Sequence, residues 1–147
     1  MKKNVEPIDK VAMTLLTSYF VSKQEKLKDT NDAFLSLSKG KCQNNCPVYD
    51  LWIFENGQVI YKGIENVIKL GVHTTTISTD IVRQMNDFIL NSNSRDIGDA
   101  KGRDNPLTII KFNNKKIVFQ SQRAKGNLLE LNNLLEHIAN MINEDNN

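Results

Sequence analysis

The two cysteines are the residues of this sequence whose type and spacing most clearly suggest chemistry. Cys42 and Cys46 are separated by three residues in the segment Ser-Lys-Gly-Lys-Cys-Gln-Asn-Asn-Cys-Pro-Val-Tyr, and the chain has no other cysteine. So short a spacing allows a disulfide, and Pro47 favours extended geometry at Cys46. We interpret the pair as a structural element, a disulfide or two close thiols, which contributes less than the ~3 kcal/mol given for a loop of about 15 residues.

Other catalytic or metal-binding arrangements find no support in the sequence. A structural zinc site needs about four ligands, whereas His73 and His137 stand singly in a predicted strand and a predicted helix. A nucleophilic thiol needs a histidine base beside it, which spacing alone does not indicate. Neither a serine-centred elbow nor a phosphate-binding glycine loop is present. We therefore expect no catalytic residue, no metal site and no cofactor.

Residues 91–106 are polar and contain one large aliphatic residue, Ile97. They predict a long, exposed and mobile loop, and such loops often bind partners. The aspartates miss the Asp-x-Asp-x-Asp-Gly spacing of a calcium loop, and the basic residues between them offset their charge. The sequence therefore favours a solvated interaction loop. Its charged residues are Arg95, Asp96, Asp99, Lys101, Arg103 and Asp104.

Hydrophobic periodicity predicts the elements that position these residues. Residues 7–22 have the spacing of an amphipathic helix, which we expect as an added N-terminal element. Strand-like segments follow, and Asn56-Gly57 between two of them is the strongest short hairpin signal. We expect these strands to form a meander. They cover residues 34–40, 48–55, 58–63 and 67–77.

The second half of the chain predicts a helix, a hairpin and a helix. The first helix is capped by Ser78 or Thr79 and ends near residue 91, and the last follows Gly126 and ends near residue 142. Residues 107–112 and 115–120 form the hairpin, and residues 143–147 are expected to fray. The sequence thus predicts an α+β fold in a single domain over residues 1–147, with an antiparallel sheet of about five to six strands packed by three helices.

Aromatic side chains in the first hairpin are interpreted as core. Trp52, Phe54 and Tyr61 could instead form a stacking platform for bases, but hairpin strands with apolar residues on both faces are usually buried. If Trp52 is buried, its replacement by alanine costs on the order of 3–5 kcal/mol.

Composition excludes several classes of protein. Nineteen basic residues against seventeen acidic ones leave a net charge of +2, which is too balanced for a general nucleic-acid binder. No run of about 18 apolar residues is present, so we expect no membrane span. The N-terminal residues lack the apolar core of an export signal, which predicts a cytoplasmic location.

The cysteine segment resembles the opening of a bacterial family known as domain of unknown function 6438. That opening reads Gly-x-Cys-x-x-x-Cys-Pro-x-Tyr and leads into a strand and a hairpin with an Asp-Gly or Asn-Gly turn. Asn56-Gly57 matches the turn, Tyr61-Lys62-Gly63 matches the end of the second strand, and residues 104–108 resemble the segment before the later hairpin. The resemblance covers residues of about 34–142. It implies a shared fold, no established activity, and frequent export, which would favour a disulfide.

Taken together, these patterns predict a non-catalytic domain that binds another protein. Binding would use the long loop or an exposed sheet edge, in an accessory subunit or an immunity-like inhibitor. The alternative is a thiol-based redox protein or another enzyme that uses Cys42 and Cys46.

Overall fold

The computed structural model of the protein describes residues 29–98 and 106–145. The predicted N-terminal helix over residues 7–22 and residues 99–105 of the predicted loop lie outside these ranges. The chain divides into the units Met1–Asp32 and Ala33–Asn147. The described residues of the second unit form six β-strands, two α-helices and two short 3₁₀ helices, η3 (Ser94–Ile97) and η4 (Ser121–Arg123).

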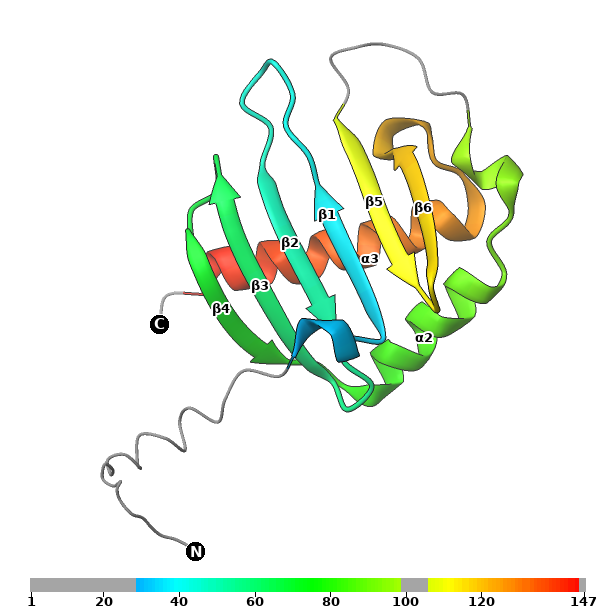
Figure 1. Cartoon of the computed structure of the whole chain (residues 1–147), viewed down its shortest axis with the longest axis horizontal. Coiled ribbons are helices and arrows are strands. Elements are labelled where there is room, and N and C mark those ends of the chain that lie inside the picture. The colour runs from blue at the N-terminus through cyan, green and yellow to red at the C-terminus, as the bar shows by residue number, and fades with distance from the viewer. Residues whose placement is uncertain (1–28, 99–105, 146–147) are drawn as a thin grey trace, which may run out of the picture. The chain divides into compact units, whose positions relative to one another are not determined.

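The six strands form one antiparallel sheet in the order β4-β3-β2-β1-β5-β6, which leaves β4 and β6 at its edges (Figure 1). Strands β1 to β4 are the predicted meander, and β5 with β6 is the predicted second hairpin, which joins the sheet where β5 pairs with β1. The predicted antiparallel α+β fold is confirmed. The strands are β1 (Leu35–Lys39), β2 (Val48–Ile53), β3 (Gln58–Glu65), β4 (Gly71–Thr76), β5 (Leu107–Phe112) and β6 (Lys115–Gln120).

Both predicted hairpin turns are present. Gly57 has a φ of 92° in the β2–β3 turn, where the side-chain oxygen of Asn56 accepts a hydrogen bond from the backbone of Gln58 at 3.0 Å. Asn113 and Asn114 have φ of 50° and 63° between β5 and β6. Asparagine and glycine tolerate this left-handed region. Both residues of the two-residue β5–β6 turn lie in it, as such turns require, whereas in the longer β2–β3 turn Gly57 lies in it and Asn56 does not. A hydrogen bond from the nitrogen of Gly57 to the carbonyl oxygen of Phe54 at 2.9 Å closes that turn.

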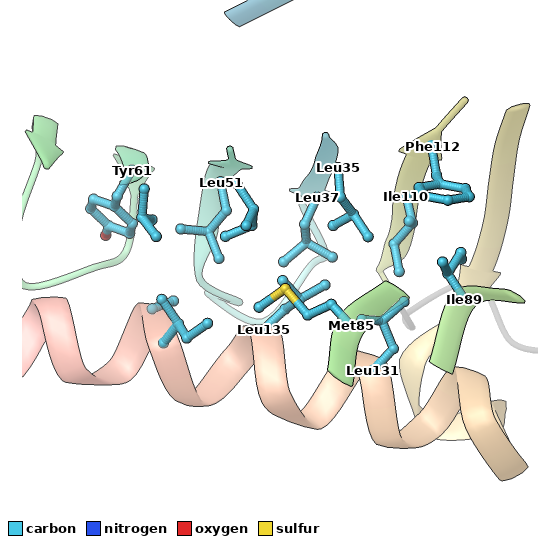
Figure 2. Close-up of a cluster of buried hydrophobic side chains, with 14 of the residues drawn as sticks. Leu35, Leu37, Leu51, Tyr61, Met85, Ile89, Ile110, Phe112, Leu131 and Leu135 are labelled. Atoms are coloured by element: carbon cyan, nitrogen blue, oxygen red, sulfur yellow. The ribbon is translucent and has the colours of Figure 1, made fainter. Parts of the chain in front are cut away.

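Two described helices, α2 (Thr79–Leu90) and α3 (Gly126–Glu144), pack on the same face of the sheet. Figure 2 shows Leu37, Leu51 and Ile110 of the strands pointing toward Met85 of α2 and Leu135 of α3. All five side chains are fully buried, and each stabilises the fold by roughly 1.5–3 kcal/mol. The prediction of three helices thus holds for two within the described residues. Neither helix has the length and apolar character needed to cross a membrane.

Trp52 does not belong to this core. Side chains alternate along a strand, so Leu51 faces the helices while its neighbour Trp52 lies on the opposite face, where it is half-buried. Phe54 and Tyr61 are buried, as predicted. The expected loss of 3–5 kcal/mol for Trp52→Ala, which assumed full burial, therefore does not apply.

Part of the predicted exposed loop is folded. Asn93 caps η3 in a reciprocal capping box with Asp96, and Ile97 packs against the core. The prediction of a long exposed loop therefore holds for the exposure of residues 93–95, but it is wrong in that residues 94–97 form a 3₁₀ helix and Asp96 is buried. It missed the capping box, which has an Asn-x-x-Asp spacing here.

The predicted frayed tail is also wrong at its start. Helix α3 continues to Glu144, beyond the predicted end near residue 142. The side chain of Asn143 holds this last turn, because it bonds the carbonyl oxygen of Ala139 at 2.8 Å and the backbone nitrogen of Lys69 at 2.9 Å.

Candidate functional site

The cysteine loop joins β1 to β2 and contains a disulfide. Cys42 and Cys46 are bonded, with their Cα atoms 5.6 Å apart, so the predicted closeness of the pair is confirmed. The sulfur of Cys42 also accepts backbone hydrogen bonds from Asn44 at 3.3 Å and from Cys46 at 3.2 Å. Asn45 takes a φ of 59°, which allows the chain to reverse within so few residues.

Two contacts attach this loop to the end of β3. The side-chain nitrogen of Asn66 donates a hydrogen bond to the carbonyl oxygen of Cys46 at 3.2 Å. The ammonium of Lys41 lies 3.5 Å from the carboxylate of Glu65, and both side chains are exposed. An exposed ion pair of this kind contributes about 0–1 kcal/mol, so the hydrogen bond from Asn66 is the more important of the two contacts.

The β3–β4 turn packs against the C-terminal end of α3. The backbone nitrogen of Lys69 donates to Asn143 Oδ1 at 2.9 Å, and its carbonyl oxygen accepts from Tyr61 Oη at 3.1 Å. Val67 packs against the core. The side chain of Val67 and the backbone of Lys69 thus face the core, and the neighbouring side chains of Ile68 and Leu70 are exposed.

Four exposed aliphatic side chains gather around this turn, between the end of β3 and the start of β4. They are 45–79% exposed. Single exposed aliphatic residues are common, whereas a local cluster is typical of an interaction surface. We call this cluster the β4 patch. It consists of Ile64, Ile68, Leu70 and Val72.

Strand β4 lies at the edge of the described sheet, and no described strand pairs with its outer side. The nitrogen of Ile77 bonds the carbonyl oxygen of Gly57 at 2.8 Å. Because backbone groups alternate in an antiparallel pair, the N–H and C=O groups of Val72, Thr74 and Thr76 point away from β3. The strand carries no charged residue and no proline, and its pairing with β3 has no register shift.

The opposite edge differs in the features that protect a sheet from unwanted pairing. Strand β6 begins with Lys115 and Lys116, which are both exposed, and η3 lies near it. Lysines on an edge strand and a covering element are common protections against strand addition. Strand β4 has no charge of its own, so of the two described edges it is the one suited to receive another strand.

A buried polar cluster links β1, β5 and α3. Lys39 is 8% exposed, and its ammonium lies 2.6 Å from Glu136 Oε2, 2.7 Å from Asn132 Oδ1 and 3.1 Å from Thr108 Oγ1. Sequence reasoning missed this cluster. The signal was present, because Lys39 continues the alternation of Leu35 and Leu37 on the helix-facing side of β1.

Burial governs the ionisation of this cluster. It lowers the pKa of Lys39, although the hydrogen bond and the charge of Glu136 partly offset this effect. Burial, together with the nearby carboxylate of Glu136, raises the pKa of Tyr49. The three partners of Lys39 match the three donors of an ammonium group, which fits a structural link between the elements better than a reactive amine. Within the described ranges, no group of histidines, cysteines and carboxylates could hold a metal ion.

The structure separates the residues of the predicted interaction loop. Arg95 is exposed, as predicted, whereas Asp96 is buried. The carbonyl oxygen of Asp96 accepts from the nitrogen of Lys125 at 2.7 Å, and its carboxylate lies beside Gly126 at the start of α3. A carboxylate stabilises a helix N-terminus, so Asp96 has a structural role. The remaining predicted residues, Asp99, Lys101, Arg103 and Asp104, lie outside the described residues.

The cysteine pair allows a stability prediction. The disulfide joins residues only four apart, so the Cys42→Ser/Cys46→Ser double variant should lose about 2 kcal/mol of unfolding free energy, less than for a longer loop. Urea denaturation of both proteins, with and without a thiol reductant, measures this loss. Reductant should shift only the wild-type midpoint. Equal midpoints for the oxidised wild type and the variant would show that the disulfide does not stabilise the fold.

Comparison with known proteins identifies the family and nothing more specific. None of the curated proteins matches the chain. The family described as Domain of unknown function (DUF6438) matches residues 33–142, which is more than half of the chain and includes all six described strands, α2, and α3 except its last two residues. The chain therefore belongs to the DUF6438 family of domains of unknown function.

Proposed function

We propose that this chain is a non-catalytic protein-binding domain that receives an extended segment of its partner along the β4 edge. The observation that carries the proposal is an open, uncharged edge strand next to the four exposed side chains of the β4 patch. Strand addition to a sheet edge is a common mode of peptide recognition, in which backbone bonds supply affinity and neighbouring side chains supply specificity.

The β4 edge and the β4 patch would contribute different interactions to this binding. A partner strand would bond the outward N–H and C=O groups of Val72, Thr74 and Thr76. The β-branched side chains of β4 favour strand structure, and a threonine can hydrogen-bond to a threonine or serine on the neighbouring strand. The β4 patch would bury apolar side chains at one end of the added strand, which gives the segment a direction and a register.

A second copy of this chain fits the edge less well than a different protein does. Two β4 strands paired about a twofold axis at Thr74 would place Leu70 of each copy opposite Ser78 of the other. Ile68 would meet Asp80. A twofold interface must be self-complementary, and this arrangement leaves the β4 patch facing polar residues. We therefore expect the partner to be a different polypeptide with a neutral strand that ends in apolar residues.

A proline at position 74 tests the proposal. The N–H of Thr74 points away from β3, so Thr74→Pro should block strand addition and keep the β3–β4 pairing. Peptides selected from a displayed random library should lose at least tenfold in affinity for Thr74→Pro and bind Thr74→Ala like the wild type. Fluorescence anisotropy measures this affinity, and circular dichroism checks the fold.

Two further measurements decide how this result is interpreted. N-methylation of alternate peptide bonds in a selected peptide should abolish its binding, because it removes the N–H groups that would form backbone hydrogen bonds with β4. Peptides that bind Thr74→Pro as tightly as the wild type would contradict the proposal. A wild-type dimer that Thr74→Pro converts to a monomer would instead identify a second copy as the occupant.

The disulfide supports a second candidate, a thiol-based redox protein. Catalysis of thiol exchange by Cys42 and Cys46 should disappear in the Cys42→Ser variant without loss of the fold, and insulin reduction provides a simple assay. Within the described residues, the bonds around the pair are backbone and amide contacts. Redox thiols usually lie beside a base or a cation that lowers their pKa. We therefore rank this candidate second.

A further inference from the structure

A largely apolar cavity of about 280 Å³ opens beside the C-terminal end of α2. It lies among elements far apart in the sequence: α2, η3, the β5–β6 hairpin and the start of α3. We propose that this cavity binds a small carboxylate with an apolar tail, a function separate from strand addition at β4. The aliphatic and aromatic side chains that line it are Ile89, Leu90, Ile97, Phe112, Ile117 and Leu128.

The walls of the cavity suit an aliphatic tail. Ile89, Phe112 and Leu128 are buried, while Leu90 is exposed at the rim. An engineered apolar cavity of about 150 Å³ binds benzene, so a cavity of about 280 Å³ has room for a longer hydrocarbon. Drug-sized ligands occupy about 300–1,000 Å³, which limits the ligand to a medium-chain molecule such as octanoate.

The positive charge of Lys115 favours a negatively charged ligand. Of the described residues that line the cavity, Lys115 is the one that carries a charge. A lysine can lay its aliphatic stem along an apolar wall while its ammonium stays at the mouth, where a carboxylate would lie. Ser92, Asn93 and Ser94 line the same cavity and add polar groups.

The negative end of α2 does not reverse this preference. Three of its last four carbonyl oxygens already have partners: that of Asp87 accepts from Asn91 Nδ2 at 2.9 Å, that of Phe88 from Ser92 Oγ at 2.8 Å, and that of Ile89 from the nitrogen of Ser92 at 3.3 Å. The nearby carboxylate of Asp96 accepts from the backbone nitrogen of Asn93 at 3.3 Å. Among the described residues that line this cavity, Lys115 is therefore the charge available to pair with a ligand.

Titration with octanoate and octanol, followed by amide chemical shifts in nuclear magnetic resonance spectra, tests the proposal. Octanoate should bind in a saturable manner and shift the resonances of Ile89, Phe112 and Leu128. Lys115→Gln should weaken octanoate about threefold and leave octanol unchanged. Lys116→Gln is the matched control, because this neighbouring lysine does not line the cavity and should have no effect.

Variants that fill the cavity provide a second test of the proposal. Ile117→Trp should abolish binding of both compounds, and Leu90→Trp at the rim replaces it if that variant fails to fold. Failure of octanoate to shift the lining residues, or unchanged binding to a folded tryptophan variant, would overturn the site. Equal binding of octanoate and octanol, unaffected by Lys115→Gln, would overturn the carboxylate preference. Since Thr74→Pro leaves this cavity intact, failure here is distinguishable from failure at β4.

Discussion

Replacing Glu136 with alanine is expected to lower the free energy of unfolding by about 3 kcal/mol, because it leaves the buried ammonium of Lys39 without its carboxylate. Breaking a buried ion pair typically costs about 3–5 kcal/mol. The side chain of Glu136 is 39% exposed, which places this pair at the low end. Urea denaturation of the wild type and of Glu136→Ala near neutral pH measures the difference.

A variant that lacks both charges separates the electrostatic contribution of the ion pair from the contribution of side-chain packing. In the Lys39→Met/Glu136→Leu variant no buried charge remains, so its stability should lie within about 1 kcal/mol of the wild type. Thr108 and Asn132 lose a donor in this variant, and that loss accounts for the remaining deficit. A double variant as unstable as Glu136→Ala would show that the loss comes from the missing hydrogen bonds to Thr108 and Asn132 and not from an unpaired buried charge.

The deficit of Glu136→Ala should shrink as the pH rises. The pKa of Lys39 is lowered from 10.5 by burial, and removal of Glu136 takes away the two effects that raise it. Between the folded and unfolded pKa values, the folded state binds fewer protons, so its stability increases with pH. The variant should therefore recover part of its loss between about pH 7 and about pH 9.5, below the titration of the tyrosines in the unfolded chain.

Local patterns in the sequence were sufficient to predict the six strands, the two helices that the structure describes and the positions of both hairpin turns. Alternation of apolar residues and paired turn residues such as Asn56-Gly57 act over a few neighbouring residues, so one sequence reveals them. The same alternation contained the signal for Lys39, which follows Leu35 and Leu37 on the core face of β1. Its partners could not be predicted, because they come from β5 and α3 and depend on how these elements pack.

The candidate site depends on the order of the strands, which local patterns do not determine. The pairing of β1 with β5 places the second hairpin beside the meander and leaves β4 at one edge and β6 at the other. Had β5 paired with β4 instead, the neutral strand would be internal. The role of Asp96 was missed for the same reason, because the helix end that its carboxylate faces begins at Gly126, far along the chain.

Gly63→Ala is expected to destabilise the protein by about 3 kcal/mol, the upper end of the usual cost of overpacking. A Cβ at this position would overlap the carbonyl oxygen of Lys69 and lie 2.8 Å from Tyr61 Oη and 2.9 Å from Val67 Cγ2. The obstacle is largely backbone, which cannot turn away like a flexible side chain. The β3–β4 turn would have to move away from α3.

Gly71→Ala is the matched control for this substitution, because it lies at the other end of the same turn with the opposite geometry. Gly71 has a φ of 81° and open space around its Cα, so alanine there costs only backbone strain, about 1–2 kcal/mol. Thermal denaturation compares the two variants. Gly63→Ala should also weaken peptide binding, since the displaced turn carries Ile68 and Leu70 of the β4 patch. If Gly63→Ala were no less stable than Gly71→Ala, the turn would not be held against Gly63, and the β4 patch would not be a preformed surface.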